Sequence, residues 1–289
     1  MRKALLLLKA IRFEHTAFAL PFALTAAFVA SSGWPQTRTL LWILVAMVGA
    51  RTAAMAFNRI ADLDYDRHNP RTAGRALVTG ALNTRQVWGL LVVAAGAYFL
   101  AAAMLNRLCL ALSPFALGAL LGYSYTKRFT VWTHWMLGCC LGLAPVGAWI
   151  AVRGRLDLPP LLLGAAVTFW TAGFDIIYAC LDIAFDRARG LFSLPARWGA
   201  QKALVVSAGN HLLTVWLLAL FGHAAGLGWL YLLGVVLLVP VLFWEHHIVR
   251  PHDLRRAETA SFFANGVFSI VLFLFAAADV ILISTRIWI

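Results

Sequence analysis

The sequence predicts an all-α protein that crosses a membrane many times, and three observations lead to this fold class. Of its 289 residues, 62% are hydrophobic and 12% are charged, whereas soluble domains carry about 25% charged residues. The apolar residues form long blocks instead of the one-sided stripes of a surface helix. The basic residues lie between the blocks and give a formal net charge of +12. We attribute this charge to membrane topology and anionic substrates, and not to a nucleic-acid partner.

About nine apolar blocks are long enough to cross a bilayer, which takes about 20 residues, or somewhat fewer or more with tilt. Charged residues interrupt the apolar run of residues 1–15, so we interpret this segment as an interfacial helix and not as a signal peptide. One domain is expected over residues 1–289, built from two pseudo-repeated four-helix halves and a last helix. The block limits are 16–33, 39–60, 86–105, 108–124, 134–152, 159–181, 203–222, 226–244 and 262–284.

Lysine and arginine are concentrated in alternate connections, and this bias orients the chain. The N-terminal segment and the connections after the second, fourth, sixth and eighth blocks hold most of them. Connections rich in Lys and Arg stay in the cytoplasm. We therefore expect the N-terminus in the cytoplasm and, after nine spans, the C-terminus outside.

Two acidic groups end the second and sixth blocks, on the side expected to be cytoplasmic. The spacing of each group places its members on one helix face. Carboxylates so close to a membrane are unfavourable without compensating cations. The donors are all oxygen atoms, with no His or Cys at ligand spacing, which favours Mg²⁺. The two groups are Asn58, Asp62 and Asp66, and Asp175, Asp182 and Asp186.

The two groups also form a weak internal repeat. "NRIADLDYD" closes the second block and "DIIYACLDIAFD" closes the sixth, with Asp62 and Asp182 120 residues apart. Repeats of this kind often place a site between the halves. The alternative is that each group consists of interfacial aspartates that pair with nearby arginines.

Basic residues around the acidic groups favour an anionic ligand. They are Arg67, Arg71, Arg75, Lys127, Arg128, Arg187, Arg189 and Arg197. Each alone would be explained as a topological anchor, but together with the carboxylates they predict a phosphate clamp. Arg51 lies deeper, seven residues before Asn58. It would either form a buried ion pair or bind the carboxylate of a small acidic substrate.

These motifs resemble those of the UbiA superfamily of intramembrane prenyltransferases. That family has nine helices and two cytoplasmic motifs, N-x-x-x-D-x-x-x-D and D-x-x-x-D, which correspond here to "NRIADLDYD" and "DIAFD". "RTAGRALVTG" is similar to the segment that follows the first motif, with Ala76 where proline is usual. "YSYTKR" is similar to a further cytoplasmic loop, and Gly190 and Ser193 match the end of the second motif. The resemblance covers nearly the whole chain.

Within the superfamily, the chain is most similar to 4-hydroxybenzoate polyprenyltransferases. Arg51 occupies the position of an arginine that binds the benzoate carboxylate in that group. "RFEHTAFALPFAL" and "RTAAMAFNR" also resemble a bacterial branch of this group, some of whose members are thought to prenylate a naphthoate for menaquinone. Both acceptors carry a carboxylate, so Arg51 does not separate them. The resemblance implies a bacterial inner (plasma) membrane enzyme of ubiquinone or menaquinone synthesis.

The resemblance also implies a mechanism and a set of residue roles. Mg²⁺ held by Asn58, Asp62, Asp66, Asp182 and Asp186 would bind the diphosphate of a polyprenyl diphosphate. Asp62, Asp66, Asp182, Asp186 and Lys127 are thus the expected catalytic residues. The acceptor is a small aromatic acid whose ring carbon attacks the allylic cation, and the lipid substrate enters from the membrane. The expected substrate-binding residues are Arg51, Arg67, Arg71, Arg128, Tyr125, Tyr178 and Asp175.

Two alternatives stay open. A membrane transporter would use the same intramembrane acids, but it predicts a polar path to the far side, and the sequence shows none. A related enzyme would use haem, chlorophyllide or a glycerol phosphate as acceptor, which Arg51 disfavours. The sequence assigns no role to Asp64, Glu14 or His15, and it predicts neither the prenyl chain length nor the oligomeric state.

Overall fold

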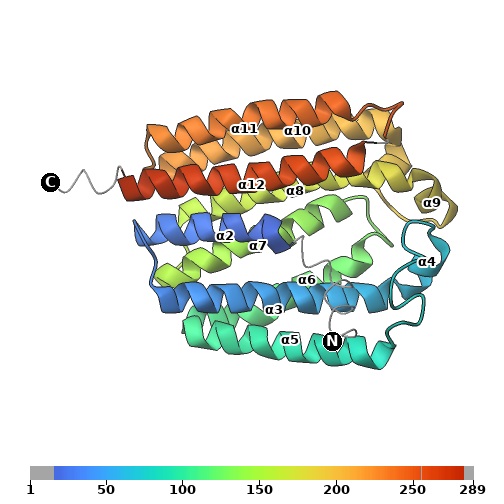
Figure 1. The fold of residues 1–289 in the computed structure, drawn as a ribbon, viewed down its shortest axis with the longest axis horizontal. Coiled ribbons are helices and arrows are strands. Elements are labelled where there is room, and N and C mark those ends of the chain that lie inside the picture. The colour runs from blue at the N-terminus through green and yellow to red at the C-terminus, as the bar shows by residue number, and fades with distance from the viewer. Residues whose placement is uncertain (1–15, 255, 283–289) are drawn as a thin grey trace. The chain divides into compact units, whose positions relative to one another are not determined.

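The structure is a computed structural model that describes residues 16–254 and 256–282, and within them the regular structure is helical (Figure 1). The segment expected to form an interfacial helix, including Glu14 and His15, lies outside the described residues. The helices are α2 (Thr16–Ser31), α3 (Thr37–Ala61), α4 (Leu63–His68), α5 (Thr84–Leu105), α6 (Arg107–Thr126), α7 (Thr133–Arg153), α8 (Leu158–Ala179), η2 (Cys180–Asp182), α9 (Ile183–Ala188), α10 (Leu194–Ala224), α11 (Trp229–Ile248) and α12 (Ala257–Leu282).

The prediction of an all-α polytopic membrane protein is confirmed. Among the described residues, eight helical segments are long and apolar enough to span a membrane. The remaining predicted span, residues 16–33, corresponds to α2, whose apolar part is shorter than a full crossing. Most helix bounds fall within a few residues of the apolar blocks. The exception is α10, which begins at Leu194 and contains a break at Gly199, where φ is 80°; this left-handed conformation favours glycine.

The chain divides into two compact units that differ from the sequence halves in one helix. The first unit contains α3 to α6, and the second contains α2 together with α7 to α12. In the second unit the aromatic rings of Phe22, Trp170 and Phe268 explain the place of α2. Phe22 lies 4.9 Å from Trp170, which stacks on Phe268 at 5.4 Å, so α2 packs against α8 and α12.

Close helix packing in the first unit depends on Gly49 of α3. A methyl group there would lie only 2.9 Å from the carbonyl oxygen of Ala94 in α5, so only glycine permits this approach. The connection from α4 to α5 folds back onto these helices, and Leu77 and Leu82 pack against Ala56. The connection is thereby held beside the end of α3.

In the second unit, α8 is the central helix. It contacts α7, α10 and α12, and α10, α11 and α12 run side by side (Figure 1). Gly138 and Gly142 of α7 face the backbone of α8 at Thr168 and Gly164 so closely that a β-carbon would clash. Small residues that let backbones approach are typical of helix packing in membranes.

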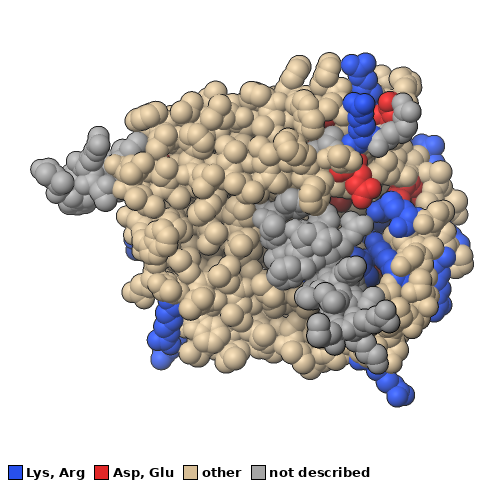
Figure 2. Space-filling view, in the orientation of Figure 1, with Lys and Arg blue, Asp and Glu red and all other residues tan. Residues whose placement is uncertain are grey.

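The charged side chains visible in Figure 2 lie mainly at the helix ends. Figure 2 shows helix sides that are almost free of Lys, Arg, Asp and Glu in this view. Exposed apolar residues within the helices include Val93, Phe115, Leu212 and Phe243, each more than two-thirds exposed. A lipid environment accounts for such a surface, which water would disfavour. The chain is therefore a multi-pass membrane protein.

Candidate active site

The first acidic motif sits where a long helix breaks. Helix α3 ends at Ala61 and α4 begins at Leu63, so Asp62 stands alone between them with φ −96° and ψ 7°. The four-residue hydrogen bonds nevertheless continue. Asp62 N donates to Asn58 O at 2.9 Å, and Asp66 N donates to Asp62 O at 2.8 Å. The predicted common face of Asn58, Asp62 and Asp66 therefore survives the break.

The second motif has a similar local geometry. Asp182 is the last residue of η2 and directly precedes α9, with φ −105° and ψ 8°. Asp186 lies in a six-residue helix as Asp66 does. Both central aspartates adopt the sparsely populated bridge region of backbone conformations, which is common at active sites. The internal repeat that the sequence indicates is thus also a repeat of backbone shape.

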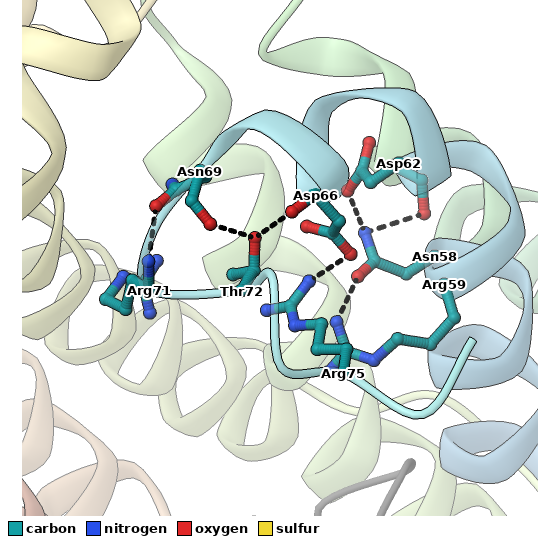
Figure 3. A network of polar contacts seen from close by, with 9 residues as sticks. Asn58, Arg59, Asp62, Asp66, Asn69, Arg71, Thr72 and Arg75 are labelled. Carbon is teal, nitrogen blue, oxygen red and sulfur yellow. Dashed lines mark hydrogen bonds and ion pairs between the residues drawn. The ribbon is translucent and has the colours of Figure 1, made fainter. Parts of the chain in front are cut away.

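A polar network holds the side chains of the first motif (Figure 3). Asn58 Nδ2 donates to Asp62 Oδ2 at 2.7 Å and faces the hydroxyl of Ser124 at 3.5 Å. Asn58 Oδ1 accepts a hydrogen bond from Arg59 Nη1. Asp66 is buried and pairs with Arg75 Nη1. The last carboxylate of the motif is therefore neutralised by a cation from the following connection.

The connection from α4 to α5 turns back and brings Arg75 next to Asp66. Thr72 Oγ1 donates to the backbone oxygen of Asp66 at 3.0 Å, and Asn69 Oδ1 accepts the backbone N–H of Arg71 (Figure 3). Arg71 is one of the predicted substrate-binding residues, and it is exposed in this turn. Arg67 is also exposed and pairs with Asp64 at 3.3 Å, away from Asp66.

The second motif is neutralised in the same way by a predicted catalytic residue. Asp186 is fully buried, and its Oδ1 lies 2.8 Å from Lys127 Nζ. Its Oδ2 accepts the hydroxyl hydrogen of Ser193 at 2.7 Å. Phe192 N donates to the carbonyl oxygen of Lys127 at 2.7 Å, which holds the two segments together. Asp182 is also buried.

Asp175 has a partner that sequence reasoning missed. His134 Nδ1 lies 2.7 Å from Asp175 Oδ2, and His134 Nε2 accepts the backbone N–H of Leu194 at 3.2 Å. The His134 side chain is 1% exposed and that of Asp175 is 27% exposed. A single histidine in an apolar helix has no spacing signal, so the sequence could not indicate this pair.

The other predicted residues fall in different surroundings. Arg51 is half-buried in α3, and its Nε has no hydrogen-bond partner within the described part of the chain. Tyr125 is exposed and its ring meets that of Phe57 edge-on at 5.8 Å. Tyr178 donates its hydroxyl to the backbone oxygen of Glu258 at 3.2 Å. Arg128 is half-buried.

The donor set suits a hard cation that shares its shell with a ligand. Among the described residues, no group of three or more His, Cys, Asp and Glu side chains is close enough to hold a metal by itself. Mg²⁺ is usually held by one or two carboxylates, with substrate phosphates and water completing its six ligands. The carboxylate and amide oxygens of the two motifs therefore fit Mg²⁺ that arrives with a phosphate.

Comparison with known proteins identifies the family of this chain. The model of the UbiA prenyltransferase family matches residues 19–267. The chain belongs to the UbiA prenyltransferase family. It is therefore a prenyltransferase, as its paired motifs indicate.

Individual relatives agree with this assignment. A "4-hydroxybenzoate octaprenyltransferase" from Citrobacter koseri is 31% identical over 255 residues, covering 87% of this chain and 86% of that protein. The apo structure of a UbiA homolog from Aeropyrum pernix K1 is 38% identical with a TM-score of 0.84, covering 92% and 98% of the two chains. A UbiA homolog from Archaeoglobus fulgidus, bound to DMAPP and Mg²⁺, is 21% identical with a TM-score of 0.62, covering 92% and 98%. The last similarity shows the UbiA fold.

Proposed function

We propose that this UbiA prenyltransferase transfers a polyprenyl group from polyprenyl diphosphate to a ring carbon of 4-hydroxybenzoate in a Mg²⁺-dependent reaction. The observation that carries the proposal is the repeated broken-helix geometry of Asp62 and Asp182, each followed by a buried, cation-paired aspartate. The relatives named 4-hydroxybenzoate octaprenyltransferase support the choice of substrates.

Mg²⁺ would be held by Asn58, Asp62 and Asp66 in one motif and by Asp182 and Asp186 in the other. When bound, it supplies Lewis-acid stabilisation of the charge on the departing diphosphate. The homolog from Archaeoglobus fulgidus that binds DMAPP and Mg²⁺ supports this assignment. The 2.7 Å hydrogen bond from Asn58 orients the Asp62 carboxylate, so this proposed metal ligand is positioned in advance.

Lys127 and Arg75 would exchange partners when the substrate binds. In the structure they neutralise Asp186 and Asp66, respectively. In the substrate complex both cations would bind diphosphate oxygens, where charge builds as the allylic C–O bond breaks, and Asp66 and Asp186 would be among the residues that hold the metal. Arg67, Arg71 and Arg128 remain proposed contacts to the diphosphate, although Arg67 pairs with the exposed Asp64 here.

Arg51 would bind the carboxylate of the aromatic acid. Its guanidinium lies inside a membrane-spanning helix, and its buried Nε lacks a hydrogen-bond partner in the described structure. A buried, incompletely bonded arginine is costly unless a ligand satisfies it. A carboxylate does so with two parallel hydrogen bonds. Tyr125 and Tyr178 are proposed to shield the allylic cation or to position the aromatic ring.

The location and pathway belong to the same proposal. The enzyme would lie in the bacterial inner membrane, with its N-terminus and active site on the cytoplasmic side and its C-terminus outside. It would act in ubiquinone synthesis with 4-hydroxybenzoate, or in menaquinone synthesis with a dihydroxynaphthoate. Both acceptors present a carboxylate to Arg51.

The test is prenyl transfer by the purified full chain in detergent. Polyprenyl diphosphate would be supplied with radiolabelled 4-hydroxybenzoate or dihydroxynaphthoate, in Mg²⁺ or in EDTA. We expect labelled lipid product from 4-hydroxybenzoate in Mg²⁺ only. Product from the naphthoate alone would assign the chain to menaquinone synthesis. Folded protein that neither forms product nor releases diphosphate would overturn the proposal and favour a transporter.

A further inference from the structure

We infer that Asp175 is the base that removes the ring proton of the aromatic acceptor, and that His134 is the positioning residue that keeps Asp175 ready for this task. The inference rests on the proposed function and deepens it. Joining a prenyl group to an aromatic carbon requires that carbon to lose its hydrogen, and no role assigned so far receives this proton.

The hydrogen bonds of His134 determine its protonation. A backbone N–H cannot give up its proton, so His134 Nε2, which accepts from Leu194 N at 3.2 Å, carries no hydrogen. The ring hydrogen therefore lies on Nδ1 and is donated to Asp175 Oδ2 at 2.7 Å. The imidazole is neutral, and it orients Asp175 without taking the proton itself.

The element that fixes His134 is also connected to the second motif. Leu194 is the first residue of α10, where a backbone N–H has no partner within its own helix. Ser193 caps the same helix end and donates its hydroxyl hydrogen to Asp186. The start of α10 thus holds both the Asp186 carboxylate and, through His134, the Asp175 carboxylate.

Asp175 differs from the motif carboxylates in what surrounds it. Asp66 and Asp186 each form an ion pair with a cation, Arg75 and Lys127 respectively. The partner of Asp175 is a neutral imidazole, which contacts its Oδ2. The side chain keeps 27% exposure, so a substrate can reach it.

Its position along α8 also suits the acceptor better than the diphosphate. Asp175 precedes Asp182 by seven residues, which places it about 10 Å further into the membrane-spanning segment. A base there is separated from the proposed metal ligands. The same part of α8 also contains fully buried residues such as Ile176 and Thr171.

The chemical step is balanced without a redox partner. The allylic C–O bond breaks and its electron pair leaves with the diphosphate. The ring carbon forms a C–C bond to the allylic carbon, and the C–H bond of that ring carbon then breaks. Its electrons restore the aromatic ring, and the proton passes to Asp175 Oδ1 and from there to water.

The test compares full-length Asp175→Asn with the wild type, using 4-hydroxybenzoate that carries deuterium on both ring carbons next to the hydroxyl. Loss of a general base lowers kcat by about 10² to 10⁴-fold. We expect that loss with an unchanged KM for polyprenyl diphosphate, and a deuterium isotope effect on kcat that the wild type lacks. Asp157→Asn, at the other end of α8 where Asp157 binds Trp149, is the control and should behave as wild type.

The role of His134 is tested by a pair of variants. Asn offers an N–H near the place of Nδ1, whereas Leu offers none, so His134→Asn should retain more of kcat than His134→Leu. Equal losses in the two variants would overturn the positioning role. If the wild type is active, full activity of Asp175→Asn would contradict the role of Asp175 as the base. Lost activity of Asp175→Asn without an isotope effect would also contradict that role. Both results would leave the proposed function intact. An inactive wild type would instead contradict the proposed function.

Discussion

The most informative residues are the two buried aspartates that end the motifs. Asp66 and Asp186 each have one cationic partner from another segment, Arg75 and Lys127. The sequence indicated the aspartates and the cations but not their pairing. Helical spacing predicts neighbours within one helix, whereas Arg75 reaches Asp66 only because the connection at Thr72 turns back. The pairing therefore required the structure.

Removal of the Lys127 charge should destabilise the metal-free protein. Lys127→Met leaves the buried Asp186 carboxylate without a cation, which costs 3–5 kcal/mol in a fully buried pair. Because Lys127 is 34% exposed, we expect about 1–3 kcal/mol. Thermal unfolding in EDTA would measure it, with the exposed Lys202→Met as control. Equal melting temperatures for the two variants would contradict the importance of this pair.

Replacement of Arg51 should affect the acceptor and not the lipid substrate. Arg51→Lys keeps the charge but loses the planar fork that binds a carboxylate with two bonds. We expect the KM for the aromatic acid to rise about 10- to 100-fold, or about 1.4–2.8 kcal/mol. The KM for polyprenyl diphosphate should not change. Arg38→Lys, near the exposed start of the same helix, is the control; an unchanged acceptor KM in Arg51→Lys would reject the assignment.

At the scale of helices, the bounds were predictable and the breaks were not. Apolar blocks identify spans because a helix must match the bilayer, and Asn106 ends α5 where the sequence places a short turn. The breaks at Asp62 and Asp182 contain neither Gly nor Pro, so no local signal indicates them. The sequence also does not indicate the hydrogen bonds from the start of α10 to Asp186 and His134, because these are tertiary contacts.

The cap of α10 should affect both stability and activity. Ser193→Ala removes the acceptor for the N–H of Ala196 and the donor to Asp186. Loss of such a cap costs about 0.5–2 kcal/mol. We expect a lower melting temperature and reduced prenyl transfer, with Ser193→Thr close to wild type on both measurements. Full activity in Ser193→Ala would show that Asp186 needs no support from α10.

The contact between α7 and α8 makes a further prediction. Gly138→Ala places a methyl group against the backbone of Thr168, whereas Gly147→Ala on the same helix meets no described atom within 4 Å. Overpacking costs about 1–3 kcal/mol, and Ala is otherwise better than Gly in a helix. The melting temperature should fall for Gly138→Ala and not for Gly147→Ala. Equal effects of the two substitutions would contradict the close packing.

At the scale of the whole molecule, the sequence predicted the membrane class, the family and the repeat. It did not predict that α2 belongs to the compact unit of α7 to α12. That grouping depends on the aromatic contacts of Phe22 with Trp170 and Phe268, which join residues far apart in the chain. Periodicity along one segment contains no information on such partners. The repeat is visible in the sequence because both copies contain two aspartates with the spacing D-x-x-x-D.

The central claim is that the broken-helix aspartates serve a Mg²⁺-dependent prenyl transfer, and a matched pair within one motif tests it most directly. Asp62 is the proposed ligand, whereas Asp64, two residues away, is 88% exposed and pairs with Arg67. In 4-hydroxybenzoate prenylation, Asp62→Asn should lower kcat by about 10²–10³-fold. Asp64→Asn should stay within about twofold of wild type, in line with other exposed surface changes. Equal activities of the two folded variants would contradict the account.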